Sequence, residues 1–375
     1  MDNRSKQIWF WFKFANPHIA GLAAALADRG YSVIFVTEES IPLERVELGW
    51  VVPDLGDARL IYAPTKAETI KLASQAPKDS VHICHGIRAN GLIQYAQKTF
   101  AQNGISHWAL MEKANDLGWR GVLKRIVYRR LFFLWKHRIS GVLAIGYRTP
   151  NWLKQQGFSE EKIFPFAYFL PESINKQKPD VGREGLFRFV FVGRFIELKC
   201  VGLLISSLAR ANLDNFELMV VGSGPLEDEL KLAAETILGR DRLRWVGRVL
   251  MTEVAQLVEQ ADCLVLPSIH DGWGAVVSEA LMVGTPVICS DACGSAEVVK
   301  ASGVGGVFRS GDESELTCLL RDMVKKGRQS GRERARLAEW GTKNLGVNAG
   351  ADYLVEILNH GSSSVAKPPL PWCRY

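Results

Sequence analysis

Short hydrophobic runs alternate with longer amphipathic stretches along most of the chain. The runs are rich in Val, Ile, Leu and Phe and do not alternate with polar residues, which is typical of strands buried on both faces of a parallel sheet. The pattern predicts strands at residues 8–12, 32–37, 59–63, 80–84, 107–111, 141–145 and 163–168, and again at 187–192, 216–221, 243–246, 262–266, 286–290 and 306–308.

The stretches between these runs repeat apolar residues every three or four positions, which predicts helices. One begins at Pro17 and ends at Gly30. In the second half, helices are expected at residues 201–211, 226–236, 252–260, 276–283 and 314–325, followed by a charged, solvated helix at 328–339, a short helix at 351–358 and a loose tail at 362–375.

The alternation of strands and helices is interrupted once, by a polar segment at residues 171–185. A chain of 375 residues is long enough for two domains. We therefore expect an α/β protein with Rossmann-like domains at 1–170 and 186–345, a linker at 171–185, and a C-terminal helix and tail at 346–375. Ligands of such sheets bind at the carboxyl ends of the strands, so a cleft between the two domains is the expected site.

Composition adds a few constraints. The net charge of +6 is too small to indicate a general nucleic-acid binder. Seven scattered cysteines fit a reducing compartment, and we interpret Cys289 and Cys293 as packing residues. The N-terminus does not resemble a signal peptide, and no apolar run is long enough for a transmembrane helix.

The segment from Ser268 to Asp291 holds the first candidate chemistry. A predicted strand runs into a turn that contains Gly272 and Gly274, and a helix follows. Two carboxylates, Asp271 and Glu279, lie eight positions apart around this turn. A strand, a glycine turn and a helix N-terminus present backbone N–H groups at the edge of a sheet, where anionic ligands bind.

Two further strand ends carry glycine and cations. The strand at 187–192 ends in Gly193-Arg194, with Lys199 five residues later, and the next strand ends in Gly222-Ser-Gly-Pro225. Two cations beside glycine turns suit a diphosphate. The alternative is an ordinary surface arginine and lysine. The Gly222 turn lacks the third glycine of a dinucleotide fingerprint, and the chain has no Walker A sequence.

Together, these motifs resemble the donor-binding domain of GT-B retaining glycosyltransferases of family 4, the glycosyl transferases group 1. That family has Gly-Arg…Lys, Gly-x-Gly-Pro, Pro-Ser, Glu-Gly-Phe-Gly-x-x-x-x-Glu-Ala and Gly-x-Pro-Val in this order. This chain has Gly193-Arg194…Lys199, Gly222-Ser-Gly-Pro225, Pro267-Ser268, Asp271-Gly-Trp-Gly-Ala-Val-Val-Ser-Glu279-Ala280 and Gly284-Thr-Pro-Val287. The resemblance covers residues 187–325 and implies a GT-B fold of two Rossmann-like domains that face a central cleft.

The resemblance also implies roles. Arg194 and Lys199 would hold the donor diphosphate, Glu279 would accept hydrogen bonds from the ribose, and Asp271 would contact the transferred sugar. The full expected donor-binding set is Gly193, Arg194, Lys199, Gly222, Gly272, Trp273, Gly274, Ala275, Val276 and Glu279. No Asp-x-Asp metal motif is present in a suitable loop, so we expect no cofactor and no obligatory metal ion.

The chain departs from the family pattern at several positions. Asp271 stands where the family has Glu, and Trp273 where it has Phe, which puts the donor sugar in question. Glu112 is the positional counterpart of a histidine that the family often has in its first domain, so the expected catalytic residues are Asp271, Arg194, Lys199 and Glu112. His85 is an alternative cleft residue or a structural histidine, and His270 is a bystander that could face the cleft.

The segment from Trp119 to Arg138 contains seven Arg or Lys residues and no acid. Its apolar residues recur at helical spacing, which predicts a basic amphipathic helix of the kind that binds anionic membrane surfaces. The residues expected to contact the membrane are Trp119, Arg120, Lys124, Arg125, Arg129, Arg130 and Trp135. Nucleic acid is a competing partner, but no nucleic-acid-reading motif accompanies the helix. The other alternative is a core-packed helix with a solvated charged face.

We therefore expect a cytoplasmic, membrane-peripheral retaining glycosyltransferase that uses a nucleotide sugar. Its acceptor would be a carbohydrate, in particular a lipid-linked saccharide in cell-surface polysaccharide assembly. Two alternatives remain open: a transferase for a small soluble acceptor, and a nucleotide-sugar-binding relative without turnover.

Overall fold

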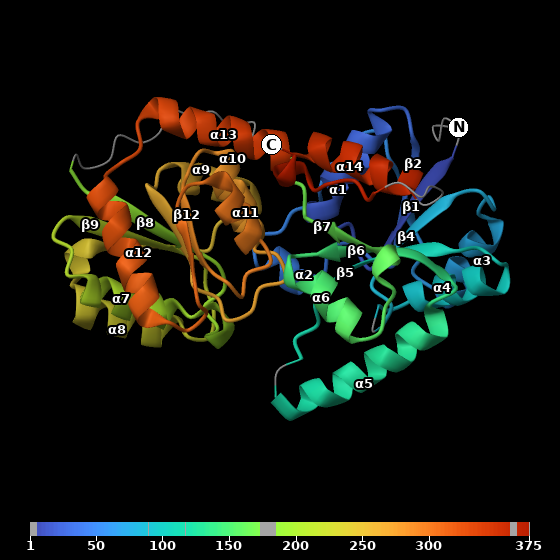
Figure 1. The fold of residues 1–375 in the computed structure, drawn as a ribbon, viewed down its shortest axis with the longest axis horizontal. Helices are drawn as coiled ribbons and strands as arrows, with labels where there is room; N and C mark the ends of the chain where they lie inside the picture. Colours follow the sequence, from blue (N-terminus) through green and yellow to red (C-terminus); the bar gives the residue numbers. More distant parts are fainter. Residues whose placement is uncertain (1–5, 89, 117, 173–184, 361–365, 375) are drawn as a thin grey trace. The chain divides into compact units, whose positions relative to one another are not determined.

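The computed structural model describes residues 6–88, 90–116, 118–172, 185–360 and 366–374. Contacts within the chain divide it into two compact units (Figure 1). The first unit contains residues 1–171 together with 347–375, and the second contains residues 172–346. Most of the expected linker at 171–185 lies outside the described residues.

The first unit is built on a parallel sheet of seven strands in the order β3-β2-β1-β4-β5-β6-β7. The central strand β1 has the sequence Gln-Ile-Trp-Phe-Trp-Phe, and its aromatic side chains are buried on both faces of the sheet. The strands are β1 (Gln7–Phe12), β2 (Ser32–Thr37), β3 (Arg59–Tyr62), β4 (Val81–His85), β5 (His107–Glu112), β6 (Ile139–Ile145) and β7 (Ile163–Phe166).

Helices cover this sheet, as the amphipathic stretches predict. They are α1 (Pro17–Ala27), α2 (Leu43–Val46), α3 (Lys66–Gln75), α4 (Ile93–Gln102), α5 (Gly118–Trp135), α6 (Arg148–Gln155) and, from the end of the chain, α14 (Val347–His360). The C-terminal helix belongs to the first unit because α14 packs along α1 (Figure 1). Arg29 of α1 forms an ion pair with Asp352 at 2.9 Å and donates to the carbonyl of Asn348.

The C-terminus differs from the expectation in two respects. The helix expected at 351–358 is present but longer, from Val347 to His360. The segment expected to be loose contains a 3-10 turn, η5 (Pro371–Cys373), and its Trp372 is only 8% exposed. Proline at the start and the burial of a large indole explain the ordered turn, because proline restricts the unfolded chain and the buried indole adds hydrophobic stabilisation.

The second unit has a parallel sheet of six strands in the order β10-β9-β8-β11-β12-β13. The strands are β8 (Phe187–Val192), β9 (Phe216–Val221), β10 (Leu243–Gly247), β11 (Cys263–Leu266), β12 (Val287–Ser290) and β13 (Gly306–Phe308). The helices are α7 (Val201–Ala211), α8 (Glu227–Leu238), α9 (Met251–Glu259), α10 (Ala275–Met282), α11 (Ala296–Ser302), α12 (Glu313–Lys326) and α13 (Gly331–Leu345). The α/β architecture with two Rossmann-like units is therefore confirmed.

Helix α5 has apolar side chains on both its inner and its outer side. Its inner side packs on the first unit through Phe132, Leu131 and Trp135. Its outer face, which we define by the exposed side chains, is largely apolar. These side chains are Trp119, Val122, Leu123, Ile126, Val127, Phe133 and Leu134. None of the described helices is both long and apolar enough to cross a membrane.

The cations of α5 are also divided between its two sides. Lys124 donates to the carbonyl of Asn115 at 2.6 Å, and Arg125 donates to that of Asp116 at 3.0 Å, so both point back toward the unit. Arg129 and Arg130 are exposed, and Arg129 donates to the carbonyl of Gln155 at 3.4 Å. Of the residues expected to contact a membrane, Lys124 and Arg125 thus point toward the unit and Trp135 packs on it, while the side chain of Arg120 lies outside the described part.

Candidate functional site

The strand order of the second sheet reverses between β8 and β11, which are neighbours in space and lead to opposite halves of the sheet. In open parallel sheets, ligands bind outside the carboxyl ends of the strands at such a point. The loop after β8 carries Arg194 and Lys199, and the loop after β11 carries Asp271. The sequence motifs therefore lie at the position where this fold binds its ligands.

Backbone hydrogen bonds join three loops into one platform at this edge. Ile269 donates its backbone N–H to the carbonyl of Leu198 at 3.0 Å, which links the loops after β11 and β8. Phe195 donates to the carbonyl of Ser223 at 3.0 Å, which links the loops after β8 and β9. Because these bonds are between backbone groups, the platform holds its shape independently of side-chain rotamers.

Two glycines allow the loops to approach this closely. A Cβ atom at Gly222 would lie 2.0 Å from the carbonyl oxygen of Gly193, and Gly222 also has a φ of +131°. A Cβ atom at Gly224 would lie 2.6 Å from the backbone nitrogen of Phe195. Any side chain would force the loops apart, which gives the Gly-x-Gly spacing a steric reason.

Lys199 and Asp271 form an ion pair across the platform, with Nζ 2.5 Å from Oδ2. Lys199 ends the 3-10 turn η3 (Glu197–Lys199), and both side chains are mostly shielded from solvent. A charge-assisted hydrogen bond of this kind holds both groups at the switch point. Arg194 lies in the same loop and is exposed.

The loop of Asp271 rests on a turn that the sequence analysis did not single out. Asp271 donates its N–H to Ala292 at 3.3 Å and accepts from the N–H of Gly294 at 3.0 Å, and Ser295 donates to the carbonyl of Trp273 at 3.0 Å. The turn follows β12, the neighbour of β11. The two loops come together only because the strands are adjacent, so a local pattern carries no signal for this support.

Helix α10 begins directly after Gly274, whose φ of +83° favours glycine. The first amides of a helix have no acceptor within it, so those of Ala275 and Val276 are oriented for an anionic ligand. The indole of Trp273 is buried and donates to the hydroxyl of Ser278 at 3.0 Å. Trp273 therefore holds the loop against the helix, and only its backbone is available to a ligand.

Glu279 lies one turn into α10, partly shielded from solvent. Desolvation raises the pKa of its carboxyl group to about 7. Among the described residues, no side chain forms an ion pair with it. A carboxyl group that titrates near neutrality and lacks a charged partner is typical of a binding site, because its hydrogen bonds are completed by a ligand.

The first unit holds the other candidate residues. Glu112 ends β5, and its carboxylate accepts a hydrogen bond from the hydroxyl of Tyr168 at 2.7 Å. The ring of Tyr168 contacts that of His18, with centroids 5.1 Å apart. Tyr168 was missed because it is 56 residues from Glu112, and no local pattern connects them.

His85 ends β4 at the same edge of the first sheet. Its ring stacks on Phe12, with centroids 5.1 Å apart. Burial, assisted by nearby Lys13, lowers the pKa of His85, so the imidazole is neutral near pH 7. His270 precedes Asp271 in the platform and is partly exposed.

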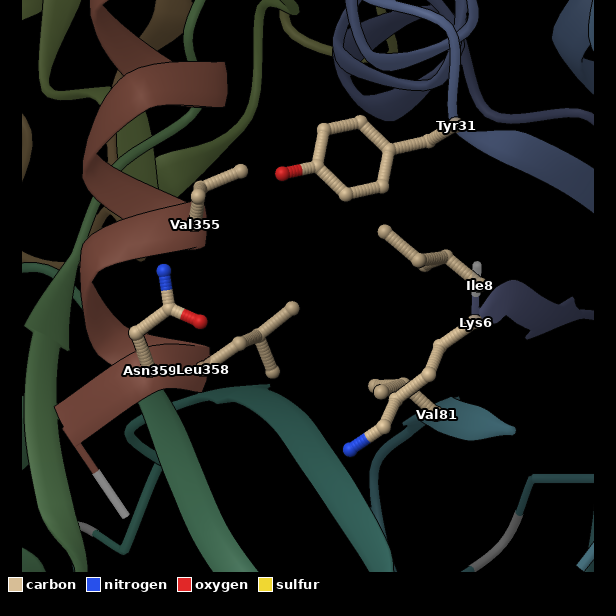
Figure 2. A pocket seen from close by; sticks show the side chains of 7 residues that line it. All are labelled: Lys6, Ile8, Tyr31, Val81, Val355, Leu358 and Asn359. Carbon is tan, nitrogen blue, oxygen red and sulfur yellow. The ribbon is translucent and has the colours of Figure 1, made fainter. Parts of the chain in front are cut away.

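A small pocket lies at the opposite end of the first sheet (Figure 2). Ile8 and Val81 line it from the amino ends of β1 and β4, and α14 closes it. Lys6, Tyr31, Val355, Leu358 and Asn359 complete the lining. Its position away from the carboxyl ends of the strands separates it from the candidate residues.

Within the described ranges, no group of three or more His, Cys, Asp or Glu side chains is arranged to hold a metal ion. Cys289 and Cys293 are both buried. Whether the reaction needs a divalent ion stays a prediction from the sequence.

The fold is shared by solved glycosyltransferases. The Anabaena protein Alr3699/HepE, solved in complex with UDP and glucose, superposes with a TM-score of 0.71 over 94% of this chain and 99% of its own, at 16% identity. Two Rossmann-like units with these strand orders define the GT-B fold, and the protein is a glycosyltransferase.

Residues 173–344 match the family described as Glycosyl transferases group 1. The match falls on the second unit, where the motifs lie. It is 27% identical to the phosphatidyl-myo-inositol mannosyltransferase of Mycobacterium leprae (strain TN) over 344 residues, which are 86% of this chain and 88% of the relative. It is 28% identical to the amylovoran biosynthesis glycosyltransferase AmsK of Erwinia amylovora over 158 residues, which are 40% of this chain and 39% of the relative.

Proposed function

We propose that the protein is a retaining glycosyltransferase that moves a sugar from a nucleoside-diphosphate sugar to a hydroxyl group of a lipid-linked saccharide. The observation that carries the proposal is the Lys199–Asp271 ion pair at the switch point of the second sheet, directly before helix α10, which carries Glu279. This set offers a cation for a diphosphate and carboxyl groups for hydroxyls.

Each residue of the platform has a role in the proposed donor complex. The diphosphate would contact Lys199, Arg194 and the amides at the start of α10. Glu279 would accept hydrogen bonds from the two ribose hydroxyls. Because Lys199 forms an ion pair with Asp271, the diphosphate would replace Asp271 as the partner of Lys199, and Asp271 would turn to the hydroxyls of the sugar.

In the proposed reaction, the bond from the anomeric carbon to the diphosphate oxygen breaks, and the acceptor oxygen bonds to the same face of that carbon. The acceptor proton moves to the departing phosphate oxygen, so no enzymic nucleophile is needed. Lys199 and Arg194 stabilise the charge that grows on the leaving group. This scheme assigns no step to a metal ion, and undiminished transfer in a chelator would support it.

The names of relatives favour a lipid or cell-surface acceptor. One is a phosphatidyl-myo-inositol mannosyltransferase, named for a phospholipid, and another is named for amylovoran biosynthesis. We accordingly place the protein at the cytoplasmic face of a membrane, in cell-surface polysaccharide assembly. A small soluble acceptor would be favoured if transfer to lipid-extractable material is absent.

The proposal is tested with radiolabelled UDP-sugars and GDP-sugars. Hydrolysis and transfer are measured for the wild type, Asp271→Asn and Glu279→Gln, and the anomeric configuration of the product is read by NMR. Wild-type turnover with retention, lost in both variants, is the expected result. If all three proteins bind donor equally and none turns over, the protein is a binding relative rather than an enzyme.

A further inference from the structure

We infer that the outer face of α5 is a membrane-insertion surface. The inference deepens the proposed function and rests on it only for the link to a lipid-linked acceptor. Of the sixteen large hydrophobic side chains that are exposed in the described residues, seven lie on this one helix. Trp119 is 70% exposed, Phe133 69% and Ile126 57%. Such a concentration of apolar side chains marks a surface that is covered by a partner.

The helix is held rigidly with this face outward. Phe132 is 1% exposed and stacks edge-on against Phe158, with centroids 5.1 Å apart. At the N-terminal end, the carboxylate of Asp116 accepts from the indole of Trp152 at 3.0 Å and from Lys113 at 2.6 Å. The outer residues cannot reach the core by rotation of the helix, because its inner side is already packed.

The charges on the helix select the partner. Exposed Arg130 lies in helical register with the apolar side chains, exposed Arg129 lies at their edge and donates to the carbonyl of Gln155, and the segment from 118 to 138 contains no acid. A second copy of the chain would bring these cations together, which is unfavourable without counter-charges. Nucleic acid would leave the apolar side chains exposed. A bilayer with anionic headgroups satisfies both features, since apolar side chains enter the acyl boundary and arginines remain among the headgroups.

The position of α5 in the chain brings this surface near Glu112, the expected catalytic residue of the first unit. Five residues lie between Glu112, at the end of β5, and Gly118, where α5 begins. The six Cα-to-Cα steps from Glu112 to Gly118 span at most about 20 Å. A helix lying in the headgroup layer therefore keeps Glu112 close to the bilayer, within reach of a saccharide attached to a lipid.

Flotation of the full chain with phosphatidylcholine vesicles, with and without phosphatidylglycerol, tests the inference. The wild type should float with the anionic vesicles. Ile126→Gln combined with Phe133→Gln should lower the partition coefficient about tenfold or more, because two inserted side chains are lost. Arg129→Gln with Arg130→Gln should mainly abolish the preference for anionic vesicles. Leu232→Gln with Ile237→Gln, two exposed apolar residues of α8, is the matched control and should float normally.

Three results would overturn the inference. The wild type could fail to float, the Ile126 and Phe133 double variant could float as the wild type does, or light scattering could reveal a wild-type dimer that this variant converts to a monomer. All substitutions are at exposed positions, and circular dichroism checks the fold. The melting shift with UDP and GDP, measured on the same preparations, reports the proposed donor site separately.

Discussion

The carboxyl edges of the two sheets carry different kinds of chemistry. In the second unit, charged side chains converge on one switch point and are supplied by short motifs, as in the Lys199–Asp271 pair. In the first unit, polar groups are paired with aromatic residues that are distant in the sequence, as in Glu112 with Tyr168 and His85 with Phe12. A diphosphate imposes a fixed geometry that short glycine and lysine motifs can meet, whereas the first edge is shaped by long-range contacts.

The largest effect is expected from Lys199→Ala. Removing the cation that would stabilise the leaving diphosphate should lower kcat/KM by about 100-fold to 1,000-fold. Lys231→Ala is the matched control, because Lys231 also forms an ion pair, with Glu227 at 2.8 Å, but within α8. Steady-state kinetics with the active donor measure both. If kcat/KM falls by less than about tenfold in Lys199→Ala, Lys199 does not stabilise the leaving diphosphate.

Gly222→Ala should destabilise the second unit through the platform. Its Cβ atom would meet the carbonyl of Gly193, and we expect a loss of about 2–4 kcal/mol in the free energy of unfolding. Gly239→Ala is the control: its φ is also positive, at +83°, but a Cβ atom there meets nothing within 4 Å. It should cost about 1 kcal/mol. Equal losses in urea denaturation would contradict the steric account.

Glu112→Gln tests whether the carboxyl edge of the first sheet acts on the acceptor. If Glu112 acts on the acceptor, transfer should fall about tenfold, while the affinity for UDP or GDP stays unchanged, because the residue belongs to the other unit. Tyr168→Phe removes only the hydrogen bond to Glu112 and should lower transfer about twofold to threefold. A change in nucleotide affinity in either variant would break the assignment of separate roles to the two edges.

The smallest effect concerns pH. The folded pKa of Glu279, about 7, is above its unfolded value, so the folded state holds its proton more tightly. This stabilisation is fully present below the unfolded pKa and is lost as pH rises through 7. From pH 5 to pH 8, the wild type should therefore lose about 1 kcal/mol more stability than Glu279→Gln. Parallel pH profiles for the two proteins would contradict the raised pKa of the Glu279 carboxyl group.

Local sequence was sufficient to predict the strands and to pick out the motif-bearing loops that meet at the carboxyl edge of the second sheet. All thirteen observed strands fall on predicted hydrophobic runs, because buried parallel strands need uninterrupted apolar residues. The motifs at Gly193, Gly222 and Asp271 lie on three loops of one platform, because the loops follow β8, β9 and β11 at one sheet edge.

Local sequence was insufficient where tertiary contacts decide. The return of α14 to the first unit depends on its packing against α1, and the burial of Trp372 depends on contacts that periodicity does not report. The helical spacing in α5 predicted the helix but could not tell which apolar residues pack inward. Only the structure distinguishes buried Phe132 from exposed Phe133.

The central claim is that Glu279 and the switch-point platform hold the nucleotide of the donor. Calorimetric titration of UDP and GDP into the wild type, Glu279→Gln and Glu259→Gln tests it most directly, because Glu259 is another partly shielded glutamate of the second unit, whose pKa burial also raises. We predict that one nucleotide binds the wild type and Glu259→Gln equally, and Glu279→Gln at least about tenfold more weakly. Equal affinity for all three proteins would contradict the claim.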